Sequence, residues 1–119
     1  MKRIIIPIII GTISLASCKK DVTPKFIPVA ENCPDTISYS MQIQPLLDIN
    51  CSTSGCHDAA SGASGYVLET HSQVSSASSI VFNAMSHSGA SPMPLGGGKL
   101  ADSLIKQFEC WIEQGLQNN

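Results

Sequence analysis

Charged and aromatic side chains are scarce in this sequence. Of its 119 residues, 13% are charged and 5% are aromatic, while 43% are hydrophobic. Charge this sparse, beside an ordinary apolar fraction, excludes a highly charged disordered chain. The formal net charge of −2 also leaves no basic excess of the kind that binds nucleic acid. We therefore expect no nucleic-acid partner.

The sequence also lacks an apolar run long enough to span a bilayer. Its main run, residues 4–15, holds twelve mostly apolar residues, whereas a spanning helix needs about 20. The run follows Lys2 and Arg3, and a basic start before a short apolar stretch is typical of a secretory signal peptide. We find no internal repeat and no useful alternating pattern of a strand. The length predicts one small domain.

The apolar run ends in Leu15-Ala16-Ser17-Cys18. This segment resembles the lipobox of bacterial lipoproteins, which implies a signal peptide over residues 1–17 and a lipidated Cys18. Acyl chains there would hold the protein at a membrane surface. The residue after Cys18 is Lys19, whereas an Asp at this position would favour retention at the inner membrane. We therefore expect the protein at the outer membrane of the bacterial envelope, where it would face the periplasm or the cell surface. The alternative is an ordinary signal peptide cut near Ala16.

Residues 18–32 are polar, contain proline and lack periodicity, so they are interpreted as the lipidated N-terminus and a tether. The folded domain is then predicted over residues 33–119. A chain of this size buries only about 60–65% of its unfolded surface. Something besides apolar side chains should therefore help to fill the core.

Two of the remaining cysteines belong to one motif. Cys51 and Cys56, followed by His57, form C-x₄-C-H, two residues longer than the C-x-x-C-H signature of c-type haem attachment. Two thiols can add to the haem vinyl groups, and the adjacent histidine can ligate the iron. A disulfide between Cys51 and Cys56, with His57 at the surface, is the main alternative. A zinc site is weaker, because it would need a fourth ligand.

A sixth ligand for such a haem is expected on the downstream loop. Met93 lies between Pro92 and Pro94, which restrict its backbone to an extended conformation. A methionine thioether raises the reduction potential relative to two histidines. His87 and His71 are the alternative sixth ligands. Met41 and Met85 are expected to fill the core.

Together these motifs resemble a small class I c-type cytochrome domain, over about residues 38–116. The resemblance implies an all-α fold wrapped around one covalently attached haem c. Cys51 and Cys56 would form the thioethers, and His57 and Met93 the axial ligands. It also implies a monomer that carries single electrons between redox protein partners. No catalysis and no small-molecule substrate are expected.

Helical periodicity is expected in four places. Residues 38–50 are predicted to form a helix that either starts near Ile43 or kinks at Pro45. Residues 69–74 and 80–85 read as two short helices, the second capped by the intervening serines. The last helix follows Ala101, with Asp102 as a possible cap and Gly115 as its C-terminal cap.

In the cytochrome family the first and last helices cross, and Trp111 is expected near that crossing. Cys33 precedes the first helix and Cys110 lies on the last. If the helices cross here, these cysteines could meet, and we expect a disulfide between them.

Two competing functions are kept open. A haem-free envelope lipoprotein, with disulfides Cys51–Cys56 and Cys33–Cys110, would have a structural or adhesion role. A haem sensor or a peroxidase-like enzyme would need Met93 to leave the iron easily.

Overall fold

The computed structural model describes residues 33, 36–89 and 91–119. The predicted signal peptide 1–17, Cys18 and the rest of the tether 18–32 lie outside the described residues. The described part contains helices and no strand, which confirms the all-α class for these residues. Its elements are η1 (Tyr39–Ile43), α1 (Gln44–Asn50), η2 (Ala63–Gly65), α2 (His71–Met85) and α3 (Asp102–Glu113). No helix among them is long and apolar enough to cross a membrane.

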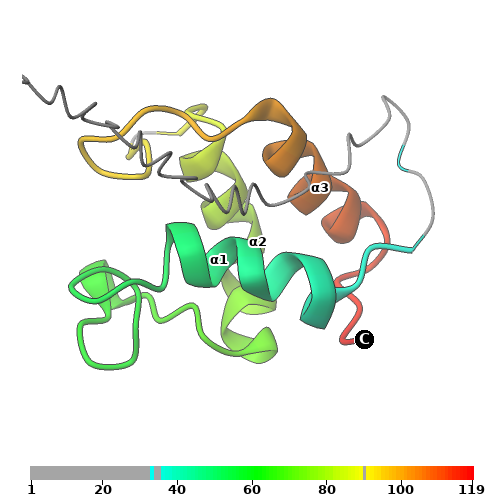
Figure 1. Ribbon diagram of the computed structural model, residues 1–119, viewed down its shortest axis with the longest axis horizontal. Helices are drawn as coiled ribbons and strands as arrows, with labels where there is room; N and C mark the ends of the chain where they lie inside the picture. The colour runs from blue at the N-terminus through cyan, green and yellow to red at the C-terminus, as the bar shows by residue number, and fades with distance from the viewer. Residues whose placement is uncertain (1–32, 34–35, 90) are drawn as a thin grey trace, which may run out of the picture.

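The first helical segment changes type at Pro45. η1 is a π-helical turn, and the Gln44 N–H that follows it donates to the Tyr39 carbonyl. Pro45 then occupies the first turn of α1, where its missing N–H leaves no intrahelical bond unmade. Figure 1 shows η1 and α1 as one continuous rod. The predicted interruption is therefore a switch from π- to α-helix rather than a break.

The two short helices predicted over 69–74 and 80–85 are wrong, because α2 is a single helix. It begins after Thr70, whose hydroxyl accepts from the Gln73 N–H in a capping box. The serines inside it do not interrupt it, since Ser75 and Ser76 donate their hydroxyls to the Ser72 carbonyl. A buried stripe along α2 stabilises the continuous helix. This stripe comprises Val74, Ala77, Val81 and Met85.

α3 ends as predicted but begins differently. Gly115 adopts a φ of +90°, and the Leu116 N–H donates to the Trp111 carbonyl at 3.0 Å, which closes a Schellman motif. At the start, Ala101 offers no side-chain cap. Asp102 does not cap the helix either. It lies in the first turn, paired with Lys99 at 2.8 Å, and this partner lowers the pKa of the Asp102 carboxyl.

Trp111 lies where the first and last helical segments pack together. It is fully buried, and its ring centroid lies 5.5 Å from those of both Tyr39 and Phe108. Its indole N–H donates to the Gln117 carbonyl at 2.9 Å. Met85 is buried as expected, whereas the expectation of a core position for Met41 is wrong, because that side chain is 78% exposed.

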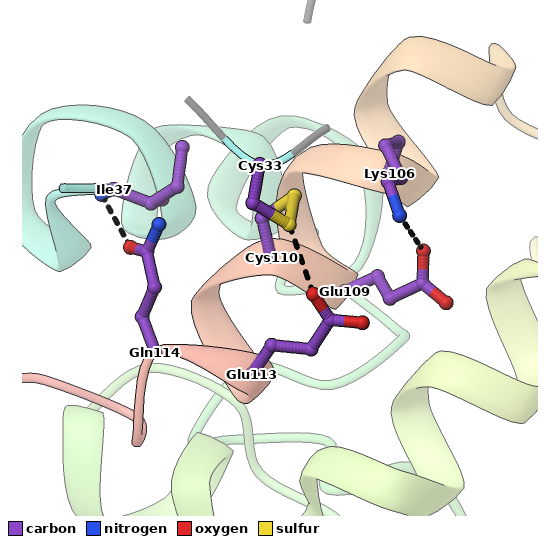
Figure 2. Close-up of a disulfide and its surroundings, with 7 residues drawn as sticks. All are labelled: Cys33, Ile37, Lys106, Glu109, Cys110, Glu113 and Gln114. Carbon is purple, nitrogen blue, oxygen red and sulfur yellow. Dashed lines mark hydrogen bonds and ion pairs between the residues drawn. A yellow bond between two sulfur atoms is a disulfide. The ribbon is translucent and has the colours of Figure 1, made fainter. Parts of the chain in front are cut away.

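A disulfide joins Cys33 to Cys110, with 5.4 Å between their Cα atoms (Figure 2). It fastens the segment that precedes η1 to the middle of α3. The Ile37 N–H adds a second tie to Gln114 Oε1 at 2.7 Å. Glu113 Oε2 lies 2.9 Å from Cys33 Sγ. A disulfide sulfur has no proton to donate, so that contact is a hydrogen bond only when the pair is reduced.

Two long connections leave the helices on the same side of the molecule. The connection from α1 to α2 and the connection from α2 to α3 both lie on the side away from the C-terminus (Figure 1). The first carries Cys51, Cys56 and His57, and the second carries Met93. The fold therefore brings the two candidate motifs to one region.

Candidate functional site

A mostly apolar cavity of about 530 Å³ lies between these two connections and α2. Its volume falls in the range of roughly 300–1,000 Å³ that is typical of small-molecule and cofactor sites. Cys51, Cys56, His57 and Met93 all line it. The structure therefore brings together the four residues that were predicted from the sequence to attach a haem and to ligate its iron.

The longer cysteine loop folds back on itself directly after α1. The Cys51 N–H donates to the Leu47 carbonyl at 2.7 Å, which continues the helical pattern into the motif. Within the loop the Cys56 N–H donates to Thr53, and the His57 N–H returns to the Cys51 carbonyl at 3.1 Å. Gly55 takes a φ of +83°, which its missing side chain permits. The two extra residues are thus absorbed in a turn, and His57 still lies beside Cys51.

The His57 ring has a defined orientation and tautomer. Its Nδ1 lies 3.0 Å from the Tyr66 carbonyl oxygen. A carbonyl can only accept, so Nδ1 carries the proton, and in the neutral imidazole Nε2 then keeps its lone pair. Histidines that ligate metals are usually held in this way by a partner on the other nitrogen. The backbone carbonyl of Tyr66 is the partner that orients His57.

Both cysteines of the motif are free thiols in the structure. The alternative disulfide between Cys51 and Cys56 is therefore not formed. Cys56 is exposed and Cys51 is half-buried. Burial, with a smaller contribution from Cys56, raises the pKa of the Cys51 thiol to about 11. Cys51 is thus a neutral thiol on the cavity wall at physiological pH.

Met93 is held through its backbone. Its N–H donates to the Ala84 carbonyl at 3.0 Å, and its carbonyl oxygen lies 3.0 Å from His87 Nε2. A second methionine, Met85, also lines the cavity from the end of α2. Sequence analysis predicted only a core position for Met85. The i, i+4 spacing from Val81, another cavity residue, is the signal that could have placed it on this wall.

The two alternative sixth ligands do not line the cavity. His71 packs edge-on against Tyr39 and Trp111, and its Nε2 lies 2.8 Å from the Leu116 carbonyl. His87 is exposed, and its Nε2 is hydrogen-bonded to the Met93 carbonyl. In this arrangement the Nε2 atom of each imidazole is hydrogen-bonded to a backbone carbonyl.

The chain was compared with protein-family models, with curated proteins and with solved structures, and none of them matches. The assignment of function therefore depends on the residues and geometry of the cavity.

The residues around the cavity fit a covalently attached haem. Two thiols can form the thioether bonds, an imidazole presents an unprotonated Nε2, and a thioether side chain comes from the other connection. Histidine and methionine are the pair that ligates the iron in c-type cytochromes, and the two thiols would bond to the porphyrin. The mostly apolar wall suits the porphyrin, and a group of that size would also complete the core of a domain this small.

Proposed function

We propose that residues 33–119 form a monohaem c-type cytochrome that carries single electrons between protein partners at the bacterial cell envelope. The observation that supports it most strongly is the shared cavity wall of Cys51, Cys56, His57 and Met93. The two cysteines would hold the haem as thioethers, and His57 and Met93 would ligate its iron. A haem bound there supplies a one-electron Fe(III)/Fe(II) couple.

The protein's own residues tune that couple. The hydrogen bond from His57 Nδ1 to the Tyr66 carbonyl fixes the orientation of the ring. Met93 offers a neutral, soft sulfur, which raises the reduction potential relative to a second histidine. The mostly apolar wall lowers the local dielectric around the site.

With His57 from one connection and Met93 from the other as its ligands, the iron would have no open position for a substrate. The proposal is therefore an electron carrier and not an enzyme. Such carriers meet their partners through small, transient contacts, which suits a monomer. A signal peptide over residues 1–17 and a lipid anchor at Cys18 complete the proposal, and they are supported by the sequence alone.

A potentiometric titration of the purified protein tests the assignment of Met93. The native protein should give a single one-electron wave. Met93→His should keep a six-coordinate haem but lower the potential, because imidazole stabilises the ferric state more than a thioether does. Met85→Leu is the matched control, since Met85 lines the same cavity and should leave the potential close to that of the native protein.

The results that contradict the proposal are distinct. A purified protein with no redox wave would favour the haem-free envelope lipoprotein, for which the disulfide Cys33–Cys110 is also suitable. A potential that changes with Met85 and not with Met93 would move the sixth ligand to Met85. Tight binding of carbon monoxide by the reduced native protein would favour a sensor or a peroxidase-like enzyme.

A further inference from the structure

We propose that His87 is a positioning residue that holds Met93 in place for the iron through the backbone of the Met93 loop. It would not bind the iron itself. The inference rests on the proposed function, because it takes Met93 as the sixth ligand.

Met93 is held on both sides by groups at the end of α2. Its N–H donates to the Ala84 carbonyl at 3.0 Å, and the same carbonyl accepts the His87 N–H at 3.2 Å. The Met93 carbonyl in turn lies 3.0 Å from His87 Nε2. Ala84 itself lines the cavity. Two hydrogen bonds thus tie the Met93 peptide to the cavity-lining end of α2 and to His87 just beyond it.

The direction of the side-chain bond follows from its chemistry. The Met93 carbonyl can only accept, so His87 Nε2 must carry a proton and donate it. The prolines on either side of Met93 have no N–H groups, so the segment has few backbone donors of its own. A side-chain donor is therefore an effective way to fix the Met93 peptide.

The backbone of His87 also points to a use for its side chain. Its φ is +58°, in the left-handed region that residues other than glycine seldom adopt. A glycine would take that conformation without strain, yet this position carries a side chain that bonds the candidate ligand's peptide. Non-glycine residues in such conformations are concentrated at functional sites.

The expected consequence is a less labile sixth ligand. A neutral hydrogen bond of this kind shifts an equilibrium by roughly three- to tenfold. Without the His87 donor, the state in which Met93 has left the iron should be populated more by about that factor. An external ligand that competes with Met93 should then bind more tightly by the same factor.

The test measures the affinity of the ferric, haem-loaded protein for imidazole. Binding is monitored through the loss of the sulfur-to-iron charge-transfer band. His87→Ala should bind imidazole about three- to tenfold more tightly than the native protein. His87→Gln, whose amide can donate to the same carbonyl, should restore part of the native affinity. His87→Gly relieves the backbone strain but removes the donor, so it should behave like His87→Ala.

His71→Ala is the matched control for His87→Ala. His71 also bonds a backbone carbonyl, that of Leu116, but it does so away from the cavity. This variant should lose thermal stability without a change in imidazole affinity. If His87 had only a structural role, His87→Ala would likewise lose thermal stability without a change in its affinity for imidazole.

Three results would overturn the inference. His87→Ala could bind imidazole no more tightly than the native protein, or His87→Gly could match the native affinity, which would leave the side chain without a role. Loss of six-coordination in His87→Ala but not in Met93→Ala would make His87 the ligand. In each case the native protein still contains covalent haem, whereas a native protein without haem would mean that the proposed function itself is wrong.

Discussion

At the scale of single residues, the direction of a hydrogen bond decides what each histidine can do. In each of the three histidines, one ring nitrogen forms a hydrogen bond with a backbone carbonyl oxygen. The nitrogen-to-oxygen distance is 3.0 Å for His57, 2.8 Å for His71 and 3.0 Å for His87. Only His57 lines the cavity, and it bonds through Nδ1, which leaves Nε2 free to ligate. The sequence identified His57 by its position after Cys56, but it could not show which backbone carbonyl each ring contacts.

The two thiols of the motif should differ in reactivity while the protein is free of haem. Cys51 is half-buried, and burial raises its pKa to about 11, so at pH 8 only about one molecule in a thousand carries the reactive thiolate. We expect iodoacetamide to modify Cys56, which is exposed, much faster than Cys51 at pH 8. Since the Cys51 thiolate increases up to its pKa, its modification should accelerate steadily between pH 8 and pH 11.

Single variants assign these rates, because both cysteines fall in one proteolytic peptide. Cys56→Ser leaves Cys51 as the reacting thiol of the motif, and Cys51→Ser leaves Cys56. Intact mass measured over time gives each rate, with the Cys33–Cys110 disulfide kept oxidised. Equal rates at pH 8 in the two variants would contradict the burial of Cys51.

At the scale of the elements, the end of α3 offers a clean test of the local structure. Gly115 has a φ of +90°, and a Cβ added there would meet nothing within 4 Å. The cost of Gly115→Ala is therefore one of backbone conformation, about 1 kcal/mol. This corresponds to a fall in melting temperature of roughly 4–8 °C for a domain of this size.

Gly98→Ala is the control for that measurement. A Cβ at Gly98 also meets nothing within 4 Å, but its φ is not in the left-handed region. Thermal unfolding followed by circular dichroism should show a normal or slightly raised melting temperature for Gly98→Ala. The Schellman motif at Gly115 would be in doubt if both variants melted at the same temperature.

The elements also show how far sequence reasoning reaches. The C-terminal cap at Gly115 was predictable, because a glycine just after an apolar stripe is a local signal. The unity of α2 was not, because a run of serines favours caps and turns. In the structure the stripe of Val74, Ala77, Val81 and Met85 outweighs that local preference by its burial. The change of helix type at Pro45 was anticipated only as an interruption.

At the scale of the whole molecule, the site depends on contacts between segments distant in the sequence. The motif residues themselves could be predicted, since thiols and a histidine at this spacing carry a chemical meaning. Their supports could not, because the Tyr66 carbonyl and the Ala84 carbonyl are backbone groups with no sequence signature. The cavity likewise exists only once α2 and both connections are packed together.

The charge of the described part gives a prediction about association. Its two lysines are both paired, Lys99 with Asp102 and Lys106 with Glu109, each at 2.8 Å. Four further carboxylates of the described part form none of its ion pairs. They are Asp48, Asp58, Glu69 and Glu113. The negative field of the domain should accelerate encounters with positively charged partners.

Small inorganic redox reagents test this field without any knowledge of the partner. A cationic oxidant should react with the reduced protein faster than an anionic oxidant of similar potential at low ionic strength. The two rates should converge as salt is added, because screening shortens the range of the field. A faster reaction with the anionic reagent at low salt would contradict the expectation of a basic partner.

The covalent attachment of haem is the central claim, and a pyridine haemochrome spectrum tests it most directly. The protein is purified from a host that matures c-type cytochromes, denatured, and extracted with acidic organic solvent before the spectrum is recorded. A variant with two residues removed from between Cys51 and Cys56, which restores C-x-x-C-H, controls for a host that rejects the longer loop. We predict haem that stays with the polypeptide and gives the α-band of a c-type rather than a b-type cytochrome. A protein that holds no haem, in both the native and the shortened form, would contradict the account.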